Sequence, residues 1–304
     1  MWIARDPASE HVLELARKVA ETSTTILITG ESGTGKDQLA RLIHEWSPRH
    51  DAPYLKIDCA SLPQELVESE LFGHERGAFT GAVERKLGRL EMAGAGTIVL
   101  DEVAALSMAI QAKLLRVLEE RHFERLGGTE TLSIEARLIA LTNADLQRGV
   151  SARRFREDLY FRLSVLAIHV PALRERRPDI VPLAEHMLAR LAAIHGRDGA
   201  ALSDAVRRVL ESYDWPGNVR ELKNALERAL IFGKNATLTP EDLPDSIRAA
   251  DSGSETVLRS IEEIEREAIE KTLEGTRYKI TRAAEILGIS RKTLLDKRKK
   301  YGLQ

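Results

Sequence analysis

The first half of the chain alternates between two hydrophobic patterns. Residues 11–21 and 36–46 have apolar positions at helical spacing, whereas residues 25–29 form a short apolar run that stops at Gly30. Further β-rich runs, with helical patterns between them, lie at residues 54–57, 97–100 and 137–141. Strands that alternate with helices favour a parallel sheet covered on both faces, so this half is predicted to be an α/β domain.

After Pro171 the pattern is helical throughout, at residues 180–195, 203–212 and 219–232, and predicts a small all-α unit. A stretch rich in Ser, Gly, Asp and Ala then predicts a linker, and the rest is helical again. We therefore expect an α/β core at 1–171, a helical lid at 172–244, a linker at 245–258 and an all-α domain at 259–304. One apolar stripe of this last domain needs a partner and consists of Ile261, Ile264, Ala268, Ile269 and Leu273.

Composition excludes several classes of protein. With 304 residues, 43% of them hydrophobic and 30% charged, the chain can bury a sizeable core and is not wholly disordered. It has no apolar run of about 18 residues that could span a membrane, and its N-terminus lacks the layout of a secretion signal. The single cysteine, Cys59, cannot form an internal disulfide. We therefore expect a cytoplasmic protein without a membrane partner.

Charge is distributed unevenly along the chain. The net charge is −2, but the segment from Thr276 to the end carries +7 and the preceding 275 residues carry −9. A basic tail on an acidic body suggests that one end meets a polyanion. A solvated, lysine-rich terminal helix would explain the charge equally well.

A glycine-rich motif directly follows the first predicted strand and opens a helix. It consists of Gly30, Glu31, Ser32, Gly33, Thr34, Gly35 and Lys36. The glycines let the backbone curl so that successive N–H groups point at phosphate oxygens, while Lys36 reaches the β- and γ-phosphates. This motif predicts ATP binding. Asp37 stands where a Ser or Thr hydroxyl usually touches Mg²⁺, so chiefly other groups must hold the metal ion.

Acidic and polar side chains end the later strands. The apolar run at 97–100 is followed by Asp101 and Glu102, a Walker B signature in which Asp101 binds Mg²⁺ and Glu102 polarises the attacking water. Asn143 ends another strand and is a candidate sensor of the γ-phosphate. Arg156 and Arg162 stand six residues apart. They are either arginines that act on a neighbouring subunit's nucleotide or members of surface salt bridges, and spacing alone does not decide.

A hexapeptide between these motifs identifies a family. It consists of Gly77, Ala78, Phe79, Thr80, Gly81 and Ala82. With this GAFTGA loop the chain resembles the NtrC-family activators of sigma-54 RNA polymerase, which are bacterial enhancer-binding proteins of the AAA+ class. The resemblance covers nearly the whole chain, including the segments at 70–75, 173–176 and 215–222.

The resemblance implies roles for individual residues. Phe79 and Thr80 lie at the tip of a nucleotide-driven loop that contacts sigma-54, and residues 125–128 resemble a second loop that supports it. Arg156 and Arg162 look like arginine fingers that reach across a subunit interface, and Arg220 looks like the sensor-II arginine of the lid. Members of the family work as ring-shaped homo-oligomers, commonly hexamers, which makes trans arginines meaningful.

One position departs from the family pattern. Asp58 stands where the family usually has an Asn that hydrogen-bonds the Walker B glutamate. If Asp58 faces Glu102, two carboxylates share one pocket and repel each other unless one is protonated. The alternative is that Asp58 points to solvent or to Lys56 and does not contact the site. The segment at 92–96, before the Walker B strand, also lacks the polar residue usual there.

The basic tail has the pattern of a helix-turn-helix. A helix at 281–287, a turn at 288–290 and a second helix at 291–301 surround a small core of Leu287, Ile289 and Leu294. The pattern resembles the Fis-type DNA-binding domain of the same family, with the preceding apolar stripe as dimer face. The candidate contacts to double-stranded enhancer DNA are Ser290, Arg291, Lys292, Thr293, Lys297, Arg298 and Lys299.

These features together predict an ATP-hydrolysing transcriptional activator. It would bind an upstream enhancer as a dimer, assemble into a ring and remodel the closed sigma-54 promoter complex. The rival interpretations are another AAA+ machine, which the hexapeptide disfavours, and a DNA-binding repressor that uses its nucleotide as a switch. About 25 residues precede the first strand. We therefore expect either a trans-acting regulator or that the chain is a fragment.

Overall fold

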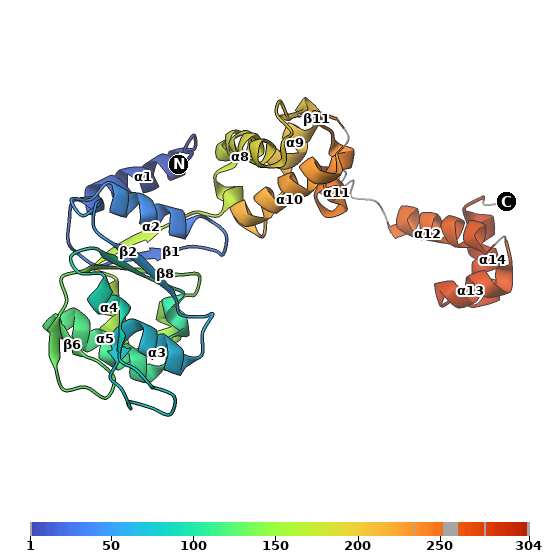
Figure 1. The fold of residues 1–304 in the computed structure, drawn as a ribbon. Coiled ribbons are helices and arrows are strands. Elements are labelled where there is room, and N and C mark those ends of the chain that lie inside the picture. Colours follow the sequence, from blue (N-terminus) through green and yellow to red (C-terminus); the bar gives the residue numbers. More distant parts are fainter. Residues whose placement is uncertain (1, 234, 252–260, 277, 303–304) are drawn as a thin grey trace. The chain divides into compact units, whose positions relative to one another are not determined.

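The chain forms two compact units, Met1–Asp251 and Ser252–Gln304. The computed structural model describes residues 2–233, 235–251, 261–276 and 278–302 (Figure 1). Within these residues no helix is long and apolar enough to cross a membrane.

A five-stranded parallel sheet forms the centre of the first unit. Its strands, in spatial order, are β2 (Tyr54–Asp58), β5 (Thr97–Asp101), β8 (Arg137–Thr142), β1 (Ile26–Thr29) and β9 (Leu166–His169). Every neighbouring pair is parallel. The predicted α/β core is therefore confirmed. The edge strand β9 was not predicted, because its four residues have no clear period of their own.

Helices cover both faces of this sheet. One face carries α1 (Pro7–Ala20) and α2 (Lys36–Glu45), and the other carries α3 (Gln64–Phe72), α4 (Arg89–Met92), α5 (Met108–Glu120), α6 (Leu146–Ser151) and α7 (Glu157–Leu163). The alternation along β1 sets the arrangement: Ile26 and Ile28 pack with α1 and α2, while Leu27 joins the opposite cluster. Figure 1 shows α1 and α2 on one side of the strands and α3 to α5 on the other.

Two hairpins extend from the face that carries α3 to α5. Strands β3 (Gly73–His74) and β4 (Lys86–Leu87) pair antiparallel, as do β6 (His122–Glu124) and β7 (Thr131–Ser133). The GAFTGA loop connects β3 to β4, and residues 125–130 connect β6 to β7. The N–H of Leu126 donates to the carbonyl of Gly73, and the N–H of Glu75 donates to the carbonyl of Leu126. The two loops are therefore joined at their bases.

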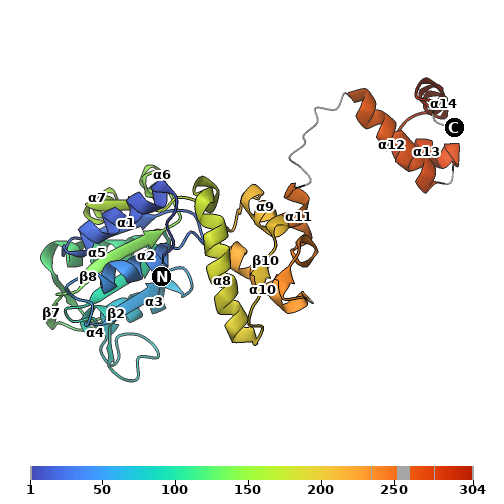
Figure 2. The same cartoon turned by 90° about the horizontal axis from the view of Figure 1, so that it is seen from above.

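The lid follows the sheet. It contains the short turns η2 (Leu173–Glu175), η3 (Arg177–Asp179) and η4 (Pro240–Asp242), and the helices α8 (Ile180–His195), α9 (Asp204–Ser212), α10 (Asn218–Phe232) and α11 (Asp245–Asp251). Figure 2 shows α8, α9, α10 and α11 next to one another. Their apolar side chains share one core, in which Trp215 is fully buried.

Two expectations for the lid were wrong. The lid is not all-α, because β10 (Ala201–Leu202) and β11 (Thr237–Leu238) form a short parallel pair. The predicted linker does not begin at residue 245, because α11 occupies 245–251 and buries Ile247 in the lid core. The polar composition of this segment hid Ile247, an apolar side chain that anchors the helix to the lid core. Residues 252–258 of the predicted linker lie outside the described part.

The second unit is a three-helix domain made of α12 (Ile261–Gly275), α13 (Ile280–Leu287) and α14 (Arg291–Lys300). Gly288 ends α13 with φ +66°, and the Ser290 Oγ caps α14 by accepting from the Thr293 N–H at 3.1 Å. Leu294 is fully buried, with Leu287 and Ile289 packed against its cluster. The predicted helix-turn-helix is therefore confirmed.

The apolar stripe on α12 is not a free face along its described length. Ile269 and Leu273 are buried in the core of their own domain, against α13 and α14. Ala268 is exposed. The side chains of Ile261 and Ile264 lie outside the described residues. The expectation that all five residues form one dimer face is therefore wrong for Ile269 and Leu273.

Candidate nucleotide-binding site and its neighbouring loops

The glycine-rich loop curls tightly between β1 and α2. Gly30, Gly33 and Gly35 have φ values of +145°, +80° and +103°. A Cβ at Gly30 would stand 2.5 Å from the Val170 carbonyl oxygen, so only glycine fits there. The ammonium of Lys36 is buried inside the curl and donates to the carbonyls of Gly30 (2.8 Å) and Glu31 (3.0 Å). Burial lowers the pKa of Lys36, and the nearby carboxylates of Glu102 and Asp101 oppose that shift.

The Walker B pair stands at the carboxyl end of β5. The Asp101 Oδ1 accepts from the Glu102 N–H at 3.1 Å, and the Asp101 Oδ2 pairs with the Lys56 ammonium at 2.8 Å. Glu102 has φ +52° and ψ +53°, a left-handed conformation that costs a non-glycine residue about 1–3 kcal/mol. The Asn143 N–H donates to the Glu102 Oε2 at 3.1 Å. Backbone strain and this bond together fix the direction of the Glu102 carboxylate.

These groups meet in one cleft of about 490 Å³ between the core and the lid. It is lined by Ser32, Gly33, Gly35, Lys36, Asp37, Gln38, Asp101, Glu102, Met187, Val219, Arg220, Lys223 and Asn224. Arg220 of α10 donates to the Ser32 Oγ at 2.9 Å, so its guanidinium contacts the glycine-rich loop. The cleft therefore brings together three cationic side chains and three carboxylates, an arrangement that can bind a polyphosphate and polarise a water molecule.

Other predicted residues lie outside this cleft. The Asn143 side chain lines a separate cavity of about 440 Å³, and only its backbone reaches Glu102. The Arg156 guanidinium pairs with both oxygens of Asp158, at 3.0 and 2.7 Å. Arg162 donates twice to the Leu118 carbonyl at the end of α5. Neither arginine lines the cleft of its own chain.

Asp58 accepts from two backbone donors of its own loop. Its Oδ1 receives the N–H groups of Ala60 (3.0 Å) and Ser61 (3.2 Å), and its side chain is exposed. Glu102 has its separate donor at Asn143. The structure therefore favours the alternative in which the two carboxylates act independently. Lys56, suggested as a partner for Asp58, pairs with Asp37 and Asp101.

A carboxylate of the glycine-rich loop also holds the lid. Arg174 donates to both oxygens of Glu31 (2.5 and 2.9 Å), and the Asn218 amide donates to Glu31 and to the Ser32 carbonyl, both at 3.1 Å. The bonds from Arg174, followed by the bond from Asn218, lower the pKa of Glu31 to about 2. Sequence reasoning missed these partners. Arg174 and Asn218 stand 143 and 187 positions after Glu31, and nothing in the sequence indicates that they pair with it.

The GAFTGA loop is a compact, exposed turn. The Gly77 N–H donates to the Ala82 carbonyl at 2.8 Å, and Gly77 and Gly81 have φ values of +83° and +107°. Phe79 is 43% exposed, and its ring stands edge-on to that of His74, with 4.9 Å between centroids. Thr80 is exposed. The turn thus presents an apolar ring and a hydroxyl to solvent.

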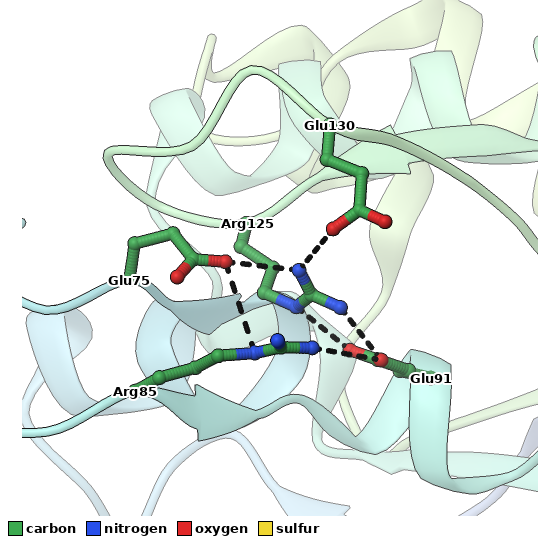
Figure 3. A network of polar contacts seen from close by, with 5 residues as sticks. All are labelled: Glu75, Arg85, Glu91, Arg125 and Glu130. Atoms are coloured by element: carbon green, nitrogen blue, oxygen red, sulfur yellow. Dashed lines mark hydrogen bonds and ion pairs between the residues drawn. The ribbon is translucent and has the colours of Figure 1, made fainter.

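A buried arginine ties this turn to the neighbouring loop. Figure 3 shows Arg125 at the centre of a cluster with three glutamates. Its guanidinium donates to Glu75 (2.9 Å), Glu130 (2.7 Å) and both oxygens of Glu91 (2.7 and 2.9 Å). Arg85 approaches Glu75 and Glu91 at 3.8 Å. Only 2% of the Arg125 side chain is exposed, so its charge depends on these carboxylates.

In the C-terminal domain the predicted DNA contacts fall into two groups. Arg291, Lys292, Thr293 and Lys299 are exposed. Lys297 instead pairs with Glu265 of α12 at 2.5 Å, which fastens α14 to α12. The guanidinium of Arg298 lies 5.9 Å from the Tyr278 ring centroid. The N-terminal end of α14 therefore presents three exposed polar side chains in succession, those of Arg291, Lys292 and Thr293.

Three family models match consecutive parts of the chain. Residues 2–169 match the sigma-54 interaction domain, residues 174–260 match the AAA+ ATPase lid domain, and residues 260–301 match the bacterial regulatory protein, Fis family. The chain is thus an AAA+ ATPase domain with a helix-turn-helix domain.

Curated relatives agree with these matches. The regulatory protein AtoC of Escherichia coli (strain K12) is 42% identical over 99% of this chain and 68% of its own length. The transcriptional regulatory protein ZraR of Salmonella typhimurium is 45% identical over 97% of this chain and 67% of its own length. The Nif-specific regulatory protein of Azotobacter vinelandii is 43% identical over 95% of this chain, which spans only 56% of that relative.

The fold agrees as well. The crystal structure of NtrX from Brucella abortus in complex with ATP matches with a TM-score of 0.77 and 35% identity, over 99% of this chain and 69% of that one. The chain belongs to the NtrC family of sigma-54-dependent transcriptional activators.

Proposed function

We propose that this chain hydrolyses ATP in a ring-shaped homo-oligomer and uses the GAFTGA loop to remodel the closed complex of sigma-54 RNA polymerase at promoters with an upstream enhancer. The observation that carries the proposal is the cleft in which Lys36, Asp101, Glu102 and Arg220 converge. It lies in a chain whose residues 2–169 match the sigma-54 interaction domain. The related NtrX binds ATP in its crystal structure, which supports ATP as the nucleotide.

The cleft residues divide the chemistry among them. Lys36 and Arg220 face the phosphates from the two sides of the cleft, the core and the lid, and neutralise their charge. Glu102 orients the attacking water and accepts its proton, helped by the fixed direction of its carboxylate. Asp101 would hold Mg²⁺, and the donor set fits, since this carboxylate lines the cleft and already pairs with a cation. Mg²⁺ supplies charge neutralisation on the phosphate oxygens.

A neighbouring subunit would complete the site. Arg156 and Arg162 sit on and before α7, away from their own cleft, so they can stabilise transition-state charge only on another subunit's nucleotide. Their present partners are an exposed carboxylate and a carbonyl. A phosphate would give Arg162 a charge-assisted bond in place of its bonds to a neutral carbonyl, and would give Arg156 a partner of the same kind as its present carboxylate.

The two joined loops would transmit the effect of ATP hydrolysis to sigma-54. Phe79 and Thr80 present the contact surface for sigma-54, and Arg125 connects that turn to the second loop. The helix-turn-helix domain would place the N-terminal end of α14, with Arg291 and Lys292, in the major groove of enhancer DNA as part of a dimer.

Transcription in vitro from a sigma-54 promoter tests the proposal. Open-complex formation should require hydrolysable ATP and should fail with a non-hydrolysable analogue. Thr80→Ala should retain ATPase activity and DNA binding while activation disappears, because Thr80 does not line the cleft. Full activation by Thr80→Ala, or activation with the analogue, would contradict the proposal.

A further inference from the structure

A lysine bridges two carboxylates that line the nucleotide cleft. The Lys56 Nζ lies 2.8 Å from the Asp101 Oδ2 and 2.9 Å from the Asp37 Oδ1. The three side chains come from three elements: the edge strand β2, the end of β5 and the first turn of α2. Lys56 and Asp101 are 33% and 21% exposed, so their pair is partly shielded from water and salt.

The carboxylates and the lysine reach this cluster from different sides. Asp37 and Asp101 line the nucleotide cleft, whereas Lys56 does not. The ammonium thus pairs with one oxygen of each carboxylate, although Lys56 itself does not line the cleft. Two carboxylates and the phosphates of a nucleotide are the ligand set that Mg²⁺ usually accepts, with water completing its shell. Lys56 is thus a fixed unit charge beside that ligand set.

We propose that Lys56 is a positioning residue that makes cation binding depend on nucleotide. Its ammonium competes with a divalent cation for the Asp101 Oδ2 and repels the cation from close range. The carboxylates alone then bind a divalent ion weakly. When a nucleotide supplies phosphate oxygens, the added negative charge outweighs Lys56 and the cation binds. The inference rests on Asp101 as the Mg²⁺ ligand in the function proposed above.

Binding of Mn²⁺, followed by its electron paramagnetic resonance signal, tests this inference without turnover. In the 304-residue chain without nucleotide, Lys56→Gln should bind Mn²⁺ about tenfold more tightly than the parent, because a unit positive charge about 4 Å from the ion is removed. Lys56→Arg keeps the charge and should stay near the parental affinity. With ADP present, the difference between Lys56→Gln and the parent should shrink.

A matched control uses another lysine. Lys113 pairs with Glu68 at 2.7 Å on a different face, so Lys113→Gln should leave Mn²⁺ affinity unchanged. Unaltered or weaker Mn²⁺ binding by Lys56→Gln would overturn the inference. If Asp101→Asn at the same time abolishes the Mn²⁺ binding that the parent shows, the proposed function still stands. Full Mn²⁺ binding by Asp101→Asn would reject the metal assignment itself, and the inference with it.

Discussion

Replacing Arg125 with methionine removes the charge that joins the GAFTGA hairpin to its supporting loop. The buried guanidinium makes four hydrogen bonds to three carboxylates. Losing one partner of a buried ion pair typically costs about 3–5 kcal/mol. The side chains of Glu91, Glu75 and Glu130 are 25%, 33% and 66% exposed and can be hydrated again, so we expect a loss of about 2–3 kcal/mol of unfolding free energy.

The penalty should depend on pH with a definite sign. The bonds from Arg125 hold the pKa of Glu91 below its ordinary value of 4.5, against the opposing effect of burial. A carboxylate whose pKa is lowered by folding stabilises the folded state above its unfolded pKa and loses that contribution as the pH falls through the folded pKa. The difference between Arg125→Met and the parent should therefore be full at pH 7 and should decrease below about pH 4.5.

Thermal unfolding at a series of pH values measures this effect. For a unit of this size, 2–3 kcal/mol corresponds to a fall of about 4–12 °C in Tm at pH 7. The control is Arg116→Met, which removes an exposed pair with Glu120 on α5 and should shift Tm by less than about 2 °C. An equal shift for the two variants, or a shift for Arg125→Met that does not change with pH, would refute the reasoning.

Three further predictions address the catalytic carboxylate, the atypical aspartate and the DNA contacts. Glu102→Gln should bind ATP with parental affinity and lose turnover by about 10²–10⁴-fold, because water activation is removed; parental ATPase rates would reject Glu102 as general base. Asp58→Asn should give a pH–rate profile superimposable on the parent's, because the backbone N–H groups of Ala60 and Ser61 hold Asp58. A displaced profile would show that Asp58 and Glu102 titrate together. Lys292→Gln should weaken binding to enhancer DNA and reduce the salt dependence of log K by about 1, and an unchanged slope in filter-binding titrations would remove Lys292 from the phosphate contacts.

The hydrophobic pattern predicted most of the fold because long elements repeat their period several times. Residues 180–195 were predicted as a helix with the bounds that α8 has in the structure. The short elements could not be predicted in this way. The two-residue strands of the GAFTGA hairpin and of the lid have no period, and they form only because backbone groups distant in sequence become neighbours.

The residues of the nucleotide site could be predicted where a single short segment contains the whole motif. Lys36 and Asp101 follow strands in motifs whose geometry is local, and the cleft brings them together. Partnerships across the fold were missed. The pairing of Lys56 with Asp37 and Asp101 depends on the order of strands in the sheet, and the attachment of Glu31 depends on where the lid lies. Such contacts arise from tertiary structure, which residue spacing does not encode.

The attachment of Glu31 to the lid has a consequence for exchanging lids between this ATPase and its relatives. The matched family models divide the chain between residues 169 and 174, as if core and lid were separable modules. A single carboxylate on the core side receives both Arg174 and Asn218 from the lid side. A lid transplanted from a relative would keep this attachment only if it brought an arginine and an amide to the same two places. A lid without them would leave the Glu31 carboxylate without its donors from the lid side.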